Sequence, residues 1–430
     1  MTAASSIVNT DNSALYRRIA LRVAPMLIVL YFVAFLDRVN ISFAALTMNR
    51  DLGISDAGYG LAAGIFFAGY LVFAVPANLA LVRFGARRWI GVLVATWGVL
   101  SMGMAFVHNV PQYVGLRFLV GSAEAGFYPG VIFYLTQWLP SRSRAGIMAA
   151  FTFAIPLSNV IGSPISAWIL RTHWSGAFAG WQWLFLLEGA PAVLLGLLTP
   201  FVLASGPGEV GWLSGEEKQS LALAMREDEA SRGAMASDSK CASFGSLILP
   251  TLTYFALMSG LYTLGFWVPK MLTRLGVPLT QIGWLTAIPF AVGGAGMLIW
   301  SRFSDRMQER RYNLTFALFA AGSGMVITGL APAPWVALVG LSFTTVGVFS
   351  AMPIFWAGFT QCISQQQAAV SIAIVNNVGQ LAGFFGPYTM GLLLQRTHHY
   401  APGLAVTAGC LFTGVVLVLC NRRLREAQMV

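Results

Sequence analysis

Residues 23–46 read VAPMLIVLYFVAFLDRVNISFAAL, an apolar run that carries Asp37, Arg38 and Asn40 in its second half. A membrane-spanning helix needs about 20 mainly apolar residues. The run has no small-residue cleavage site, so we interpret it as a retained span and not as a signal peptide. Ionisable residues inside such a span are expensive to bury, which makes them functional candidates.

The composition extends this interpretation to the whole chain. Of its 430 residues, 57% are hydrophobic and only 10% are charged, whereas soluble proteins have about 25% charged residues. So few charges cannot cover a water-exposed surface. The formal net charge of +10 comes mostly from Lys and Arg in alternate loops, and we expect a lipid bilayer and no nucleic acid as partner.

Eleven further apolar windows predict an all-α membrane protein with 12 transmembrane helices in two six-helix halves. Together with the first run, the twelve windows are 22–46, 58–82, 89–107, 111–138, 145–170, 181–204, 247–271, 281–301, 313–331, 334–360, 368–394 and 402–420. We therefore expect an N-terminal half in residues 1–204, a cytoplasmic linker in 205–245 and a C-terminal half in 246–430. Within the linker, Ser214 and Glu217 predict a capping box for a short surface helix through Arg226.

The distribution of basic residues predicts that both termini are cytoplasmic. On this topology 19 of the 26 Lys and Arg residues lie on the cytoplasmic side, while the outer loops hold mainly Arg50, Arg171, Arg274 and Arg396. Short cytoplasmic loops carry such an excess of positive charge. We expect a multi-pass protein of a bacterial cell inner membrane.

Five ionisable side chains fall inside predicted spans, namely Asp37, Arg38, Arg117, Glu124 and, near the end of a span, Glu188. Each costs about 2.5–3.5 kcal/mol at a helix centre. Arg117 and Glu124 are seven residues apart and share a helix face. Arg38 is rotated about 100° from Asp37 and points elsewhere.

Small and polar neighbours complete these two faces. Gly121 stands between Arg117 and Glu124, where it leaves room for a ligand or for a neighbouring helix, and Asn40 shares the face of Asp37. Arginine suits a carboxylate ligand because it is always charged and bidentate, and a desolvated carboxylate can take up a proton. The alternative is that the charges neutralise each other in packing, with Asp37 and Arg117 as an interhelical pair.

The C-terminal half offers uncharged candidates for a cavity. Asn376 and Gln380 share a face at a spacing of four residues, with Asn377 beside them, and Tyr262 and Trp356 add aromatic rings. Buried amides need hydrogen-bond partners. These side chains therefore either line a substrate cavity or hold neighbouring helices together.

Motifs of other protein classes are absent from the sequence. There is no Walker sequence, HExxH motif or nucleophile elbow, and Cys241, Cys362, Cys410 and Cys420 form no CxxC pattern. We expect no enzyme, no cofactor and no metal, and transport driven by an ion gradient. A proton-antiporting exporter of amphiphilic compounds and a receptor-like sensor are the alternatives.

Five stretches resemble the major facilitator superfamily and, within it, the anion:cation symporter family. They are Phe35–Ile41, Arg117–Gly130, Gly180–Gly189, Trp212–Ser214 and Asn376–Pro387. The resemblance covers the whole chain and implies an alternating-access carrier with a central cavity, which we expect to be a monomer. It implies that Asp37 and Glu124 are protonation sites.

The same resemblance assigns Arg38 and Arg117 to the substrate carboxylate or its coupling, and Tyr70 to the cavity. We thus expect a proton-coupled symporter that imports a small organic carboxylate anion, with Tyr262, Trp356 and the amides of the C-terminal half as further substrate contacts.

The sequence departs from the family pattern at three places. Asn78 and Val82 replace Gly and Asp in the loop after the second span, whereas the related loop after the eighth span keeps Asp305 and Arg306. Ile155 and Pro156 stand roughly where sugar-acid carriers of the family have a glutamine. This favours aromatic or short carboxylates, such as hydroxyphenylacetate, phthalate, nicotinate or tartrate, over polyhydroxylated acids.

Overall fold

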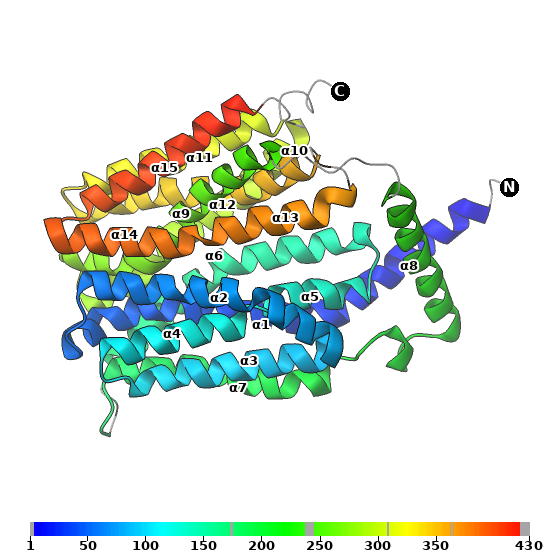
Figure 1. Cartoon of the computed structure of the whole chain (residues 1–430), viewed down its shortest axis with the longest axis horizontal. Helices are drawn as coiled ribbons and strands as arrows, with labels where there is room; N and C mark the ends of the chain where they lie inside the picture. Colours follow the sequence, from blue (N-terminus) through cyan, green and yellow to red (C-terminus); the bar gives the residue numbers. More distant parts are fainter. Residues whose placement is uncertain are drawn as a thin grey trace.

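The computed structural model describes residues 4–172, 174, 176–236, 245–307, 309–361, 363 and 365–421, whose secondary structure is helical (Figure 1). Its α-helices are α1 (Ala4–Asp51), α2 (Asp56–Phe84), α3 (Ala86–Gly103), α4 (Val110–Glu124), α5 (Phe127–Thr136), α6 (Ser141–Arg171), α7 (Gly180–Val202), α8 (Gly215–Ala236), α9 (Gly245–Arg274), α10 (Leu279–Met307), α11 (Arg311–Gly329), α12 (Pro334–Gln361), α13 (Gln365–Gln380), α14 (Ala382–Thr397) and α15 (Ala401–Cys420). Two short 3₁₀ helices are η1 (Met104–Phe106) and η2 (Pro207–Glu209).

The predicted twelve-span, all-α fold is confirmed. Ten segments of the described chain are long and apolar enough to cross a membrane, one of them formed by α4 and α5 together. The remaining two spans are α11 and the pair α13 and α14, which correspond to the windows 313–331 and 368–394. The long helices lie side by side, and α1 begins at the same end of the bundle at which α15 ends (Figure 1). We call the opposite end the distal end.

Two spans predicted as continuous are each broken into two helices. α4 ends at Glu124 and α5 begins at Phe127, while α13 ends at Gln380 and α14 begins at Ala382. Gly126 and Pro129 explain the first break, because glycine weakens a helix and proline lacks the N–H that the preceding turn requires. Membrane proteins tolerate such breaks where the freed backbone groups lie inside the protein.

Most helix–helix contacts lie within one half of the sequence, and a smaller set joins the two halves. α3 packs against α7 and α2 against α4 in the first half, and α11 packs against α12 and α15 in the second. Between the halves, α2 packs against α14, α6 against α10 and α1 against α9.

The contact between α2 and α14 brings backbone against backbone towards the distal end. A Cβ atom added at Gly60 would lie 2.4 Å from the carbonyl oxygen of Pro387, and one at Gly391 would lie 2.4 Å from that of Asp56. A side chain at Gly64 would meet Phe384 in the same way. Only glycine permits so close an approach, so this glycine seal holds the two halves together at the distal end.

Two polar contacts reinforce the glycine seal. The Tyr59 hydroxyl donates to the carbonyl of Phe266 at 2.6 Å, and Lys270 Nζ lies 2.6 Å from Asp56 Oδ1. The same ammonium group lies 4.8 Å from the centre of the Tyr59 ring and 5.2 Å from that of Trp267. Cation–π contacts of this kind stabilise a partly buried cation, so α2 and α9 are joined by both charge and aromatic packing.

The linker helix α8 begins with the predicted capping box. The Glu217 N–H donates to Ser214 Oγ at 3.1 Å, and the Ser214 N–H donates to Glu217 Oε2 at 2.9 Å. The Ser214 N–H and the Arg18 guanidinium, which pairs with Glu217, hold the pKa of this carboxyl below its usual value. α8 runs beyond the predicted end at Arg226 as far as Ala236. Cys241, Cys362 and the Arg422–Arg425 tail lie outside the described residues.

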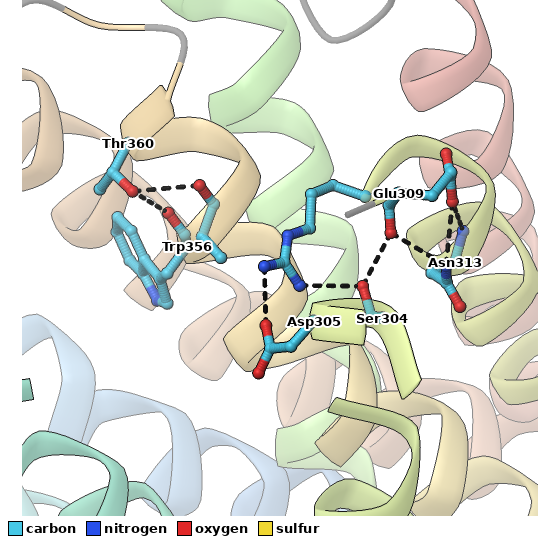
Figure 2. Close-up of polar contacts among 8 residues, drawn as sticks. Ser304, Asp305, Glu309, Asn313, Trp356 and Thr360 are labelled. Carbon is cyan, nitrogen blue, oxygen red and sulfur yellow. Dashed lines mark hydrogen bonds and ion pairs between the residues drawn. The ribbon is translucent and has the colours of Figure 1, made fainter. Parts of the chain in front are cut away.

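The loop between α10 and α11 forms a compact polar network (Figure 2). Arg310 Nη2 lies 2.7 Å from Asp305 Oδ1, and Arg310 Nη1 donates to Ser304 Oγ at 3.0 Å. The Glu309 carboxylate accepts hydrogen bonds from the N–H groups of Tyr312 and Asn313, which caps the first turn of α11. The aspartate that the second loop retains is therefore paired with an arginine.

The related loop between α2 and α3 is held in another way. Val82 is largely exposed, at 72% of its accessible area. Arg87 anchors this loop by donating to the carbonyl of Pro200 at 2.5 Å and by lying 3.6 Å from Glu209. Here the arginine connects α3 to the end of α7, and Val82 stands where the related loop has Asp305.

The glycine seal provides a test of the packing. We expect Gly60→Ala to destabilise the protein by about 1–3 kcal/mol, because the added methyl group overpacks the contact with α14. The measurement is the melting temperature of the purified protein in detergent. Gly115→Ala on α4, where an added Cβ meets no atom within 4 Å, is the matched control. Equal melting temperatures for the two variants would show that α14 does not lie against Gly60.

Candidate functional site

Arg38 and Glu124 form a two-pronged ion pair between α1 and α4. Arg38 Nη2 lies 2.9 Å from Glu124 Oε1, and Arg38 Nε donates to both carboxylate oxygens at 3.1 and 3.2 Å. The Glu124 side chain is 4% exposed and that of Arg38 is 15% exposed. Bidentate, charge-assisted contacts are the strongest hydrogen bonds that a protein forms, so the pair fixes the two spans relative to each other.

The helix break positions Glu124. It is buried and is the last residue of α4, directly before the turn at Ala125 and Gly126. A carboxylate at this position is stable only beside a cation or when it carries a proton. Arg38 supplies the cation in this structure.

Arg117 lies deeper in the bundle and has no such partner. Arg117 is 2% exposed as a whole residue, and its Nε and Nη2 atoms are buried without a hydrogen-bond partner. The ring of Phe66 lies 4.9 Å from the Arg117 guanidinium and 5.3 Å from that of Arg38. The space beside Gly121 is filled by α2 and not by a ligand, because a Cβ atom added there would lie 1.9 Å from the Phe66 carbonyl oxygen.

Two tyrosines and an amide lie around the ion pair. Tyr70 and Tyr262, from α2 and α9, are both near enough to Arg38 and Glu124 to interact electrostatically. The Tyr262 hydroxyl donates to Gln380 Oε1 at the end of α13. The structure therefore brings Arg38, Glu124, Tyr70, Tyr262 and Gln380 together from both halves of the chain.

The ring of Phe67 links this group across the interface between the halves. It lies 4.3 Å from the ring of Tyr262, and it would collide with any side chain at Gly383. Phe67 thus contacts α9 and α14 from its place on α2. The predicted substrate residues sit directly beside the surface at which the two halves meet.

Trp356, Asn376 and Asn377 come from α12 and α13 of the C-terminal half. Trp356 packs edge-on against Tyr254 at 4.9 Å. Tyr254 also lies against the α13 backbone, where an added Cβ at Gly379 would be 2.2 Å from its ring. Asn376 and Asn377 are half-buried. These three side chains belong to an aromatic and amide wall on the C-terminal half.

Asp37 points away from Arg38, as the helical spacing predicts. Its Oδ1 accepts from Ser101 at 3.1 Å and from Asn40 at 3.3 Å, while Oδ2 is buried without a partner. The two carboxylates expected to take up protons are therefore in different surroundings. Glu124 faces an arginine, and Asp37 faces hydroxyl and amide groups.

Sequence reasoning missed Tyr31, Tyr128 and Tyr254. The Tyr31 ring lies 5.8 Å from that of Tyr128, and Tyr31 also interacts electrostatically with Arg38. Helical spacing could have found Tyr31, which is seven residues before Arg38 and so shares its face. Tyr254 is likewise eight residues before Tyr262. Within the described part of the chain, no three His, Cys, Asp or Glu side chains are grouped so that they could hold a metal ion.

A twelve-span bundle with buried charges at the interface between its halves defines a polytopic membrane transporter. A family model described as Major Facilitator Superfamily matches residues 27–387. The chain therefore belongs to the major facilitator superfamily, a family of transporters and not of enzymes.

Curated relatives are similar over almost their whole length. The chain is 42% identical over 419 residues to a protein of Agrobacterium vitis named "Putative tartrate transporter", which covers 97% of this chain and 96% of that one. It is 37% identical over 404 residues to a "Quinolone resistance transporter" of Acinetobacter baumannii, covering 93% of both chains.

Among solved structures, a bacterial homologue of the human lysosomal transporter Spinster, in an inward-facing and unoccupied conformation, has the same fold. The TM-score is 0.75 at 17% identity, and the match covers 96% of this chain and 98% of that one.

The ion pair gives a test of the site. We expect Arg38→Met to destabilise the protein by about 3–5 kcal/mol, because it leaves the Glu124 carboxylate buried without a cation. The double variant Arg38→Met/Glu124→Gln should recover part of this loss. Thermal unfolding of the three proteins in detergent measures the difference. A double variant no more stable than Arg38→Met alone would contradict the pairing.

Proposed function

We propose that this protein is a proton-coupled symporter that imports a small organic carboxylate by alternating access. Arg117 and Arg38 bind the carboxylate, and Asp37 and Glu124 take up protons. Tyr70, Tyr262, Gln380 and the wall formed by Trp356, Asn376 and Asn377 provide the remaining contacts. The single observation that carries the proposal is the buried guanidinium of Arg117 with two unpaired nitrogens.

An unpaired, buried guanidinium needs an anion. Its N–H groups have lost their water without gaining acceptors, which is a large free-energy cost unless a ligand supplies them. A carboxylate can accept two parallel hydrogen bonds from a guanidinium. Phe66, which faces both arginines, provides an apolar surface beside the bound anion.

The Arg38–Glu124 pair couples the anion to protons. A substrate carboxylate that approaches Arg38 competes with Glu124 for the same donors, and protonation of Glu124 releases them. Import of an anion into a negative interior also works against about 2.3 kcal/mol per charge per 100 mV. Co-transported protons offset this cost, and two carboxylates permit more than one proton per anion.

Alternating access follows from the contacts between the halves. Residues 1–204 and 246–430 would move as two units joined by the linker 205–245, with the glycine seal and the Asp56–Lys270 pair closing the distal end in this conformation. Transporters of this fold rock around a site near the bilayer midplane. From the charge bias we propose that both termini lie in the cytoplasm of a bacterial cell and that the distal end lies outside.

The substrate class is supported from two directions. The relative that is named for tartrate is 42% identical along nearly the whole chain. Ile155 and Pro156 offer no side-chain hydrogen-bond donor for sugar hydroxyls, and Ile155 is buried. We propose short or aromatic carboxylates as substrates.

Export of amphiphilic compounds is the second candidate. The relative named for quinolone resistance is 37% identical over 93% of both chains. The packed rings of Tyr254, Phe355 and Trp356 could contact a flat aromatic compound. An exporter would release such compounds in exchange for protons. The direction of proton-driven movement separates the two functions.

Uptake by proteoliposomes tests the proposal. We expect an inward proton gradient to drive accumulation of a radiolabelled aromatic or dicarboxylic acid, and a protonophore to abolish it. Arg117→Gln should weaken binding of the acid by roughly 30-fold or more, since a buried charge pair contributes about 2–5 kcal/mol. Arg50→Gln, at an arginine that is 84% exposed, is the control. Efflux of dyes without uptake of any acid would support the exporter instead.

Removal of one carboxylate tests the coupling. We expect Glu124→Gln to abolish accumulation driven by a proton gradient while exchange of labelled for unlabelled acid continues, because the variant cannot bind or release a proton at this position. Both rates are measured in the same proteoliposomes, with Glu216→Gln in the exposed linker as the control. Retention of proton-driven accumulation would remove Glu124 from the coupling.

A further inference from the structure

A second buried carboxylate lies beside Asp37. Glu188, on α7, is 2% exposed, and its Oε1 accepts from the Ser166 hydroxyl of α6 at 2.6 Å. Glu188 and Asp37 repel each other electrostatically, and the Asn40 amide interacts with both carboxyl groups. Four helices, α1, α3, α6 and α7, thus contribute polar side chains to one cluster inside the first half of the chain.

This cluster has more hydrogen-bond acceptors than donors, even though the Trp97 indole N–H also lies near Asp37. The hydroxyls of Ser101 and Ser166 already donate to the two carboxylates. Three oxygen atoms nevertheless remain buried without a partner, namely Asp37 Oδ2, Asn40 Oδ1 and Glu188 Oε2. Buried polar atoms are almost always paired in native proteins. Three unpaired acceptors in one cluster indicate that a positively charged ligand belongs there.

The charge balance leads to the same result. Inside the spans of the first half, three carboxylates, Asp37, Glu124 and Glu188, stand against two guanidiniums. Arg38 is engaged by Glu124. The charged groups of α4 that act on Asp37 are Arg117, which is attractive, and Glu124, which is repulsive. When Arg117 binds a substrate anion it no longer compensates the cluster, and two adjacent carboxylates are left in a medium of low dielectric.

We propose that Asp37 and Glu188 bind one monovalent cation between them, a proton or a sodium ion, at a site separate from the Arg38–Glu124 pair. A proton on either carboxyl would donate to one of the unpaired oxygens. A sodium ion would be held by carboxylate, amide and hydroxyl oxygens, the ligand type that hard cations prefer. Glu188 is thereby assigned a role in cation binding. Its role in coupling rests on the proposed function, whereas the binding of the cation does not.

Infrared spectroscopy of the purified, full-length protein in lipid tests the proton. We expect the absorption of protonated carboxyl groups that appears on acidification to include a band that Glu124→Gln leaves in place and that both Glu188→Gln and Asp37→Asn remove. Glu216→Gln should leave the band unchanged. Ser166→Ala keeps both carboxyl groups and should shift the frequency of the band, because Glu188 loses its hydroxyl donor; this variant serves if the others fail to fold.

Thermal unfolding tests the sodium ion in the same proteins. If sodium is the ligand, sodium chloride raises the melting temperature of the unaltered protein over that in choline chloride, and Glu188→Gln abolishes the difference. Equal melting temperatures in the two salts, together with a carboxyl absorption on acidification that neither Glu188→Gln nor Asp37→Asn reduces, would overturn the inference. If the band behaves as expected but no carboxylate is taken up, the cation site stands and the proposed function fails.

Discussion

Ionised side chains cannot be left uncompensated inside an apolar bundle, and this constraint shapes the first half of the molecule. Arg38 and Glu124 satisfy each other with three short contacts. Arg117 and Asp37 are satisfied only in part. Arg38 and Glu124 therefore hold two spans together, whereas Arg117 and Asp37 remain available to a ligand. In the proposed function, binding of an anion and of cations would complete the second group, and substrate and coupling ion would stabilise each other.

The two broken spans place the site chemistry at helix ends. Glu124 closes α4 and Gln380 closes α13, one in each half of the chain. Tyr262 contacts Gln380 and lies near Glu124, so it connects the two breaks across the interface. The break in the first half thus carries a carboxylate and the break in the second half an amide, so the two halves present different functional groups at corresponding positions.

The sequence predicted those features that the bilayer dictates. Apolar windows located the spans because each must satisfy its own backbone, and helical spacing placed Asp37 with Asn40 and turned Arg38 away. Helical spacing could not predict that Arg38 contacts Glu124, because spacing defines a face of a helix but not the helix that packs against it. The windows 111–138 and 368–394 ran through the breaks at Gly126 and Leu381, because spans tolerate glycine and proline. Tyr31 and Tyr254 were missed because aromatic residues are common in any span.

The glycine seal has a consequence for the speed of the transport cycle. Where Gly60, Gly64 and Gly391 meet α14 and α2, the touching surfaces are smooth and made largely of peptide groups. At these three positions no side chain is interlocked with the opposite helix, so the backbones can part there without a change of rotamer. The kinetic barrier to opening the distal end should therefore be set by the Asp56–Lys270 pair, the Tyr59 hydrogen bond and the aromatic contacts of Tyr59 with Trp267 and of Phe67 with Tyr262, and much less by the glycine contacts.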